Sequence, residues 1–519
     1  MTHSFGAARR RLSLFAGSSL AVASLVAGVG GLVAVGVTPT QALAADECGN
    51  PSANAGANDV FVCTDAAVYP TGINYTTTTN GNLGLLLQDG LTTTTGGVQV
   101  VGNAGEDLTV QTLQIFANTG DINIQNAGGV GIRVVSPDSN VVVDLTDLDA
   151  GDAPMTVSGA TGGVHAITGG AGTVDVTVTN GVVTTTGNWA VRGQSGSGDV
   201  TVDLGAATVS GNAGGLFTNT SGDTDITMTG GSLTGTGWAL QALSSGGDID
   251  VDLGAATLSG GIGLEAATTG GSATVTSTGA ITATGAGRAV RVDGSNAATV
   301  SVTGPVVSNT GDGVFVQSGV GGVDLTTGAV TSTGGIAVYA RANNGGDVTV
   351  VTGGAVSGAT GLSAEASGSG VIDVTTGGTV TGTTGNGILL TGLQGADVVL
   401  DSTAGLVTGA TNGISVSTVG GDVDVTTGAV TAGAAGTAVD IATTSGDVDV
   451  TTNGTLLGEI GIEVLNASGD TTIIVNGDID VTDNAIVAYG DVVPPFAGAG
   501  LVDITIAAGS TVTTDAGGL

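Results

Sequence analysis

Short stretches of alternating apolar and polar residues recur along most of this chain, separated by glycine-rich breaks. One phrase reads GDVTVDLGAATVSG from Gly198 and returns as GGDVDVTTGAVTAG from Gly420. Each repeat holds three such pieces, for example residues 422–425, 329–331 and 335–339. Alternation over four to six residues predicts a half-buried β-strand. Glycine at the breaks allows the tight bends between strands.

The repeat has a fixed period, which is set out by the aspartates that open successive phrases, Asp199, Asp223 and Asp248. A period in the twenties indicates a stacked array of supersecondary units. Three strands in one period predict an all-β fold, a right-handed parallel β-helix with three sides, in which each strand pairs with its equivalent about 4.8 Å along the axis. About fourteen such turns fit between residues 173 and 519. Immunoglobulin-like repeats are excluded because they need about 100 residues each.

The N-terminus has the pattern of an export signal. Arg9, Arg10 and Arg11 precede an apolar stretch, residues 12–37, and residues 42–44 fit an A-x-A cleavage site. An uncleaved membrane anchor is the alternative, since the apolar stretch is long enough to span a bilayer. We expect an exported protein at the cell surface or outside the cell. The predicted organisation is a signal peptide (1–44), an N-terminal cap with the first turns (45–105), irregular turns (106–171) and regular turns (172–519).

Charge excludes one class of partner. The three arginines of the leader leave five basic residues against 44 acidic ones, a net charge of about −39 for the rest of the chain. Such a body repels phosphate backbones and anionic lipid surfaces, so nucleic-acid binding is excluded. An unknown surface ligand or a polysaccharide remains as the expected partner.

Two cysteines, Cys48 and Cys63, directly follow the leader. In an exported chain two nearby cysteines most simply form a disulfide. Closing a loop of that size stabilises a fold by roughly 3 kcal/mol in the chain-entropy model. We therefore expect a disulfide that fastens the N-terminal cap.

Aspartates in the first strand of each repeat should face solvent in lines, because the valines between them face the core. Asp248, Asp250 and Asp252 are the candidates for a Ca²⁺ site that relieves the repulsion between neighbouring carboxylates. The alternative is a solvated acidic face without any cofactor. The calcium-binding nonapeptide repeat is absent.

A second set of side chains is expected on the outer side of the third strand. Glu265 and Arg291 fall on adjacent turns and should form a cross-strand ion pair. Arg288 should lie at a corner with its head in solvent. Surface filling and a ligand site are the two interpretations of the set, which comprises Arg192, Gln241, Glu265, Arg291, Gln317, Tyr339 and Glu365.

Catalysis has little support, and we expect no enzyme. His165 is the single histidine after the leader and is expected as a surface residue of a strand. Glycoside hydrolysis uses a pair of acidic residues, and such pairs occur throughout this sequence. A polysaccharide-active enzyme therefore remains the alternative. Thr-x-Thr pairs such as Thr184 and Thr186 suggest an ice-binding solenoid as a further alternative, although such surfaces need the pair on successive turns and here it recurs on alternate turns.

Together these features resemble the passenger region of bacterial type V autotransporters of Gram-negative proteobacteria. The resemblance rests on the long leader, on ECGN…VFVCT around Cys48 and Cys63, on YPTGINYTTTT after them and on the glycine-rich repeats. It implies a rod on the surface or outside the cell, often an adhesin, exported through a C-terminal 12-stranded barrel. No barrel follows here, so we expect a truncated chain whose contact with membranes is limited to a missing barrel or to export. The function expected is a non-enzymatic adhesive or structural rod.

Overall fold

The structure, a computed structural model, describes residue 48 and residues 59–64, 68–76, 81–113, 122–146, 154–489 and 500–515. The predicted leader, residues 1–44, lies outside these ranges. The described residues form strands, turns and bends. No helix among them is long and apolar enough to cross a membrane.

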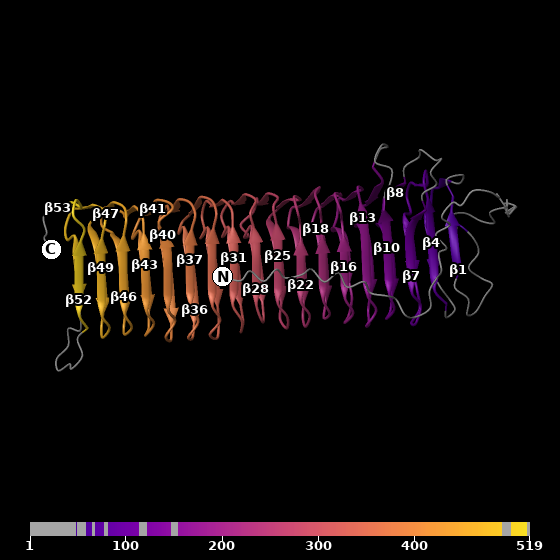
Figure 1. Ribbon diagram of the computed structural model, residues 1–519. Helices are drawn as coiled ribbons and strands as arrows, with labels where there is room; N and C mark the ends of the chain where they lie inside the picture. Colours follow the sequence, from indigo (N-terminus) through magenta and orange to yellow (C-terminus); the bar gives the residue numbers. More distant parts are fainter. Residues whose placement is uncertain are drawn as a thin grey trace, which may run out of the picture. The chain divides into compact units, whose positions relative to one another are not determined.

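The chain winds into a three-sided parallel β-solenoid, which confirms the predicted all-β fold class. One turn consists of β22 (Ile249–Asp252), β23 (Thr257–Gly260) and β24 (Ile262–Thr268). Each of these strands pairs in parallel with the strand three later in the chain, so three sheets run along the axis. We call them sheet A, sheet B and sheet C, after β22, β23 and β24. Figure 1 shows the strands of sheet A side by side from β1 (Asp59–Cys63) to β52 (Val502–Ile506).

The strands used below have the following bounds. In sheet A they are β13 (Val174–Thr179), β16 (Val200–Asp203), β19 (Thr224–Thr227), β25 (Ala273–Ser277), β43 (Val423–Thr427) and β46 (Val448–Thr452). In sheet B they are β8 (Asn123–Asn126), β11 (Thr156–Gly159), β14 (Val182–Thr185), β17 (Thr208–Gly211), β20 (Ser232–Gly235) and β26 (Ile281–Ala283). In sheet C they are β9 (Val130–Ser136), β12 (Gly162–Thr168), β15 (Trp189–Gln194), β18 (Gly214–Thr220), β21 (Trp238–Ser244), β27 (Val290–Gly294), β30 (Val314–Ser318), β33 (Val338–Ala342) and β36 (Leu362–Ser367).

The register follows the sequence period. Val200 pairs with Thr224 and Thr224 with Ile249, so one turn of the solenoid corresponds to one repeat of the sequence. Every third strand from β13 to β52 belongs to sheet A, fourteen in all, as the period predicts. Two turns in the predicted irregular region are longer, since Leu108 pairs with Val141 and Val141 with Val174, whereas Leu83 pairs with Leu108 at the ordinary spacing.

The core is a set of apolar columns along the axis. Val176, Val202, Ile226, Val251 and Val275 are in register on successive turns, and each is fully buried. Burying a side chain of this size contributes about 1.5–3 kcal/mol. Because half of each contact lies on the neighbouring turn, the turns stabilise one another and none can form its core alone.

The predicted cysteine pair lies at the N-terminal end of the described solenoid. Cys48 and Cys63 are disulfide-bonded, with their Cα atoms 4.7 Å apart. Cys63 ends β1 and is fully buried, so the bond ties the preceding chain to the first turn.

The aspartates that mark the sequence period form a ladder at the corner before sheet A. The Oδ1 atom of Asp199 accepts a hydrogen bond from the backbone N–H of Asp223 at 3.0 Å, and that of Asp223 from Asp248 at 2.9 Å. Asp248 in turn accepts from the N–H of Ser272 at 2.8 Å. The same bond recurs in the later pairs Asp347–Val371, Asp397–Asp422, Asp422–Asp447, Asp447–Asp470 and Asp470–Leu501. The repeated aspartate therefore joins consecutive turns.

Substituting one rung of this ladder should loosen one corner. In the Asp248→Ala protein the Ser272 N–H loses its acceptor, which costs about 1 kcal/mol, so its hydrogen exchange should accelerate about fivefold. Asp248→Asn keeps a carbonyl acceptor, as Asn140 does for Thr173 at 2.9 Å, and should exchange like the parent. Amide exchange resolved to the Ser272 peptide measures both. Equal exchange in the Ala variant and the parent would contradict the role of the ladder.

Candidate functional site

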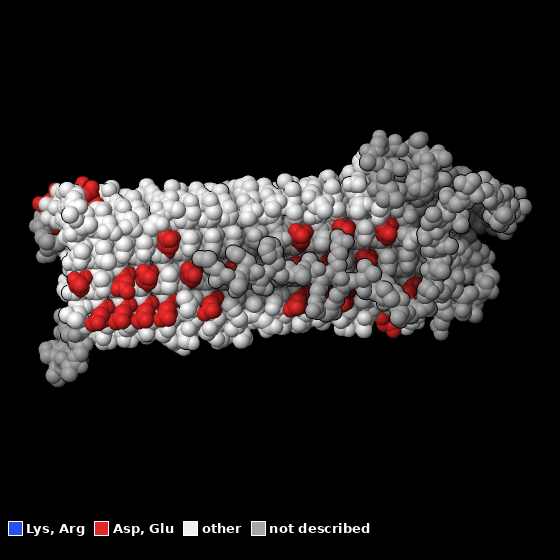
Figure 2. All heavy atoms as spheres, viewed as in Figure 1, with Lys and Arg blue, Asp and Glu red and all other residues white. Residues whose placement is uncertain are grey.

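The outer face of sheet A is acidic. Figure 2 shows acidic side chains in rows along this face and no described Lys or Arg on its uncovered part. Most outward aspartates are opposite threonines, as Asp225 is opposite Thr201. Asp225 is directly opposite Asp250, and Asp424 opposite Asp449. Burial raises the pKa of Asp225 and Asp250, and the neighbouring carboxylates raise it further.

The three calcium candidates are spread along one strand and its corner. Asp248 accepts a hydrogen bond from the Ser272 N–H. Asp252 accepts hydrogen bonds from the Gly254 N–H at 3.2 Å and the Thr276 hydroxyl at 2.9 Å. Asp250 lies between them on β22. Within the described ranges no group of three His, Cys, Asp or Glu side chains is arranged to hold a metal ion. The bonds of Asp248 and Asp252 are those of a structural corner.

The outer face of sheet C differs in chemistry. One column of outward side chains, in register on successive strands from β9 to β33, comprises Arg133, His165, Arg192, Phe217, Gln241, Glu265, Arg291, Phe315 and Tyr339. The sequence-based set was wrong in two places. Gln317 pairs with Asp293 and Glu365 with Arg341, so both belong to the next column, two residues further along each strand. Phe217 and Phe315 take part instead.

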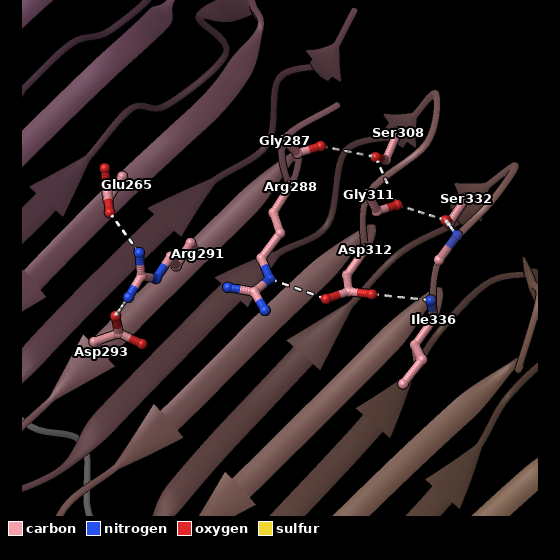
Figure 3. A network of polar contacts seen from close by, with 11 residues as sticks. Glu265, Gly287, Arg288, Arg291, Asp293, Ser308, Gly311, Asp312, Ser332 and Ile336 are labelled. Carbon is pink, nitrogen blue, oxygen red and sulfur yellow. Dashed lines mark hydrogen bonds and ion pairs between the residues drawn. The ribbon is translucent and has the colours of Figure 1, made fainter. Parts of the chain in front are cut away.

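Glu265 connects three turns of this face. Arg291 Nη1 lies 2.9 Å from Glu265 Oε1, so the two residues predicted to pair across the strands are in contact. Trp238 Nε1–H and Gln241 Nε2–H both donate to Oε2, at 2.9 and 2.8 Å. The second guanidinium nitrogen of Arg291 pairs with Asp293 at 2.6 Å (Figure 3). Every oxygen of Glu265 is therefore used in holding neighbouring side chains.

Arg288 lies at the corner between sheets B and C. Its Nε is 2.9 Å from Asp312 Oδ2 on the next turn, and its guanidinium is stacked 3.8 Å from the centre of the Phe315 ring. The other carboxylate oxygen of Asp312 accepts the Ile336 N–H at 3.0 Å (Figure 3). The corner position was expected, but the head of Arg288 is only partly in solvent because Asp312 and Phe315 hold it.

Aromatic rings adjoin one another at the start of this face. Trp189 stacks on Phe217 with ring centres 5.1 Å apart and lies 5.9 Å from Trp238. All three rings are partly exposed. Gly214 is in register between the two tryptophans, and a Cβ there would overlap the Trp189 ring. Glycine therefore makes room for the ring to lie flat along the strand.

His165 is buried, which corrects the expectation of a surface residue. Only 6% of the residue is exposed, and its ring covers Gly162, where a Cβ would overlap it. The Nε2–H donates to the Trp189 carbonyl at 3.1 Å. Burial, with a smaller contribution from the charges of Arg192 and Arg133, lowers the pKa of His165 to about 4. The imidazole is therefore neutral at pH 7.

The sequence-based set contained Arg192 but not Arg133, His165 or Phe217, which share its column. The signal was present, because each outward residue directly follows the buried apolar residue of its strand: His165 follows Val164, Arg192 follows Val191 and Phe217 follows Leu216. Aligning these residues requires the register between successive turns. In the sequence this register is obscured because the glycine-rich corners differ in length.

Over much of its length, sheet B carries hydroxyl groups on its outer face in place of charges. Its outward column places serine and threonine opposite one another on six successive turns, at Ser158, Thr184, Ser210, Thr234, Ser259 and Thr282. The second threonine of each Thr-x-Thr pair has no such column, since Thr236 bonds to Asn212 on the turn before it. The two-threonine width that ice binding requires therefore occurs on alternate turns only. A hollow of about 300 Å³ lies on this face, lined by residues that include Thr94, Gln125, Asn126, Ser158, Thr184 and Thr186.

Comparison with known proteins adds no relative: no protein-family model, no curated protein and no solved structure matches this chain.

Acidification should relieve the energetic cost of the carboxylates buried in the solenoid. Burial raises the folded-state pKa of six aspartates above their ordinary value of 3.8: Asp175, Asp225, Asp250, Asp293, Asp424 and Asp440. The folded chain then binds these protons more tightly than the unfolded chain, so these groups contribute stability as the pH falls through the raised values towards 3.8. His165, whose pKa is lowered to about 4, and Asp478, whose pKa is lowered by its hydrogen bonds with Thr511, act in the opposite direction. The effect of the aspartates is therefore measured against a variant that keeps both groups.

Thermal unfolding of the parent and of the Asp225→Asn/Asp250→Asn protein between pH 7 and pH 4 measures this effect, because both proteins keep His165 and Asp478. We expect the Tm of the parent to rise relative to that of the variant as the pH falls. A difference in Tm between the two proteins that does not change with pH would contradict the raised pKa values.

The fit of Trp189 over Gly214 can be tested separately. Gly214→Ala should displace the indole ring and reduce the near-ultraviolet circular dichroism of the aromatic group, because the added Cβ overlaps the ring. Gly230→Ala is the matched control, since its nearest neighbour would be 3.9 Å away. The prediction is wrong if both variants keep the parent spectrum.

Proposed function

We propose that this chain is an exported, non-enzymatic rod that adheres to polysaccharide through the outer face of sheet C from β9 to β24. The observation that carries the proposal is the gathering of rare residue types on one side. Aromatic residues make up 3% of the chain, yet both tryptophans lie in sheet C. The five arginines after the leader lie in sheet C strands or at the corner before one of them.

The chemistry of this face suits sugars. Partly exposed aromatic rings present flat apolar surfaces on which the C–H faces of sugar rings can pack. Planar side chains beside them, Gln194, Asn219 and Gln241, present the paired donors and acceptors that hydroxyl groups use. Because turns repeat about every 4.8 Å along the axis, a polymer lying along the face meets several turns and gains from multiple contacts.

Adhesion is favoured over hydrolysis by how the acidic groups of this face are used. Glu265 accepts hydrogen bonds from Trp238, Gln241 and Arg291, and Asp293 is paired with Arg291. His165 is buried and its ring N–H is bonded to a carbonyl. A glycosidase needs two carboxyl groups free to face one scissile bond. The resemblance to autotransporter passengers supports display on the cell surface or release from it.

The rings should carry the affinity. In the full chain, Trp189→Ala/Trp238→Ala should weaken retention in polysaccharide-containing native gels about tenfold or more, since loss of a stacked ring removes about 1–3 kcal/mol. Val307→Ala on sheet B, where the side chain is 43% exposed, is the control and should behave like the parent. Circular dichroism in the far ultraviolet confirms that each variant is folded.

Two outcomes would contradict the proposal. Unchanged retention of the tryptophan variant across a panel of neutral and acidic polysaccharides would place adhesion elsewhere. Release of shorter sugars from any of these polymers would show an enzyme. Cells that lose the gene should also attach less well to surfaces.

A further inference from the structure

Two arginines of sheet C differ from the other three in their partners. Arg288 pairs with Asp312, Arg291 with Glu265 and Asp293, and Arg341 with Glu365. Arg133 and Arg192 make no ion pair with any residue of the described ranges. Two guanidinium groups that meet no carboxylate among the described residues can bind an anion from outside.

These two arginines lie close together. Arg133 is opposite His165 on β9 and β12, and His165 is opposite Arg192 on β12 and β15. Both guanidinium charges contribute to lowering the pKa of the His165 ring between them. Since the imidazole is neutral, it separates the two cations without adding a third charge.

The strands that carry the two arginines contain no acid. The five strands of sheet C from β9 to β21 hold no Asp or Glu, although the chain has 44 acidic residues. The acidic rows of sheet A lie on another face, and at physiological ionic strength charges are screened over about 8 Å. The formal charges on these five strands are therefore those of the two arginines.

Arg192 is positioned by its neighbours and still has guanidinium N–H donors that they do not use. Its Nη2 donates to Gln194 Oε1, and its guanidinium carbon lies 5.7 Å from the centre of the Phe217 ring. A guanidinium has five N–H donors in a planar fork that matches a carboxylate. Phe217, stacked on Trp189, continues the surface directly beside the charge. A cation next to a flat apolar surface suits a ligand that combines an anionic group with a sugar ring.

We propose that Arg133 and Arg192 bind the carboxylate groups of an acidic polysaccharide, with the adjoining sugar ring packed on Phe217 and Trp189. The inference rests on the proposed function and specifies its ligand class, a polymer of uronic acids. A nucleic acid fits less well, because its affinity depends on many phosphate contacts and this face offers two unpaired cations.

The test compares two polymers with the same sugar backbone: polygalacturonate, whose carboxylates are free, and its fully methyl-esterified form, in which each carboxylate is replaced by an uncharged ester. The full chain should bind polygalacturonate at least tenfold more tightly in physiological salt. Arg133→Gln/Arg192→Gln should remove that preference while leaving affinity for the ester within about twofold. Arg288→Gln/Arg341→Gln removes the same charge from paired arginines and is the matched control, expected to keep the preference.

The outcomes separate this inference from the proposed function. Equal affinity of the parent for the two polymers, no binding to polygalacturonate, or an equal loss in both double variants overturns the carboxylate site. The tryptophan variant then still decides adhesion, because its effect on neutral polysaccharides does not depend on the arginines. A variant that loses its far-ultraviolet spectrum is replaced by the Arg133→Gln or Arg192→Gln single variant, each expected to lose part of the preference.

Discussion

The backbone hydrogen bond between one turn and the next is the interaction on which this molecule depends. Each strand of the three sheets finds its donors and acceptors in the strands one turn before and one turn after it. At the corners the aspartate ladder makes the same connection with a side chain, as between Asp223 and Asp248. No turn is complete without its neighbours, so every side chain has to be compatible with the residues above and below it in its column.

Column neighbours decide the chemistry of each group. Asp225 and Asp250 face one another across two turns. Burial raises the pKa of both, and the charge of Asp250 raises that of Asp225 further, whereas Asp252 on the same strand raises that of Asp250. Arg291 faces Glu265 and is neutralised by it. Arg192 faces His165, which carries no charge at neutral pH, and keeps its guanidinium free. Residues with the same identity therefore differ in function according to what lies one turn away.

The three faces consequently have different characters on one scaffold. Sheet A presents acidic rows that keep rods apart through like charge. Sheet B presents hydroxyl and amide groups without charge over six successive turns. Sheet C concentrates aromatic rings and arginines, the groups with the largest potential for specific contact. Outward residues contribute little to the core. Each of the three faces can therefore carry different side chains while the core stays uniform.

The sequence by itself determined the repeat, the strands and the three-sided parallel solenoid. The alternation of apolar and polar residues is a local pattern, and its fixed period means that each turn has the same arrangement of strands. It also placed Glu265 and Arg291 on adjacent turns, at equivalent points of two successive repeats. Only the tertiary structure decided that Phe315 and not Gln317 follows Arg291 in the column, that His165 is covered, and that the repeated aspartate bonds to the next turn. These properties depend on the register between residues one repeat apart and on the path of glycine-rich corners, and the corner path is set by packing against the neighbouring turn.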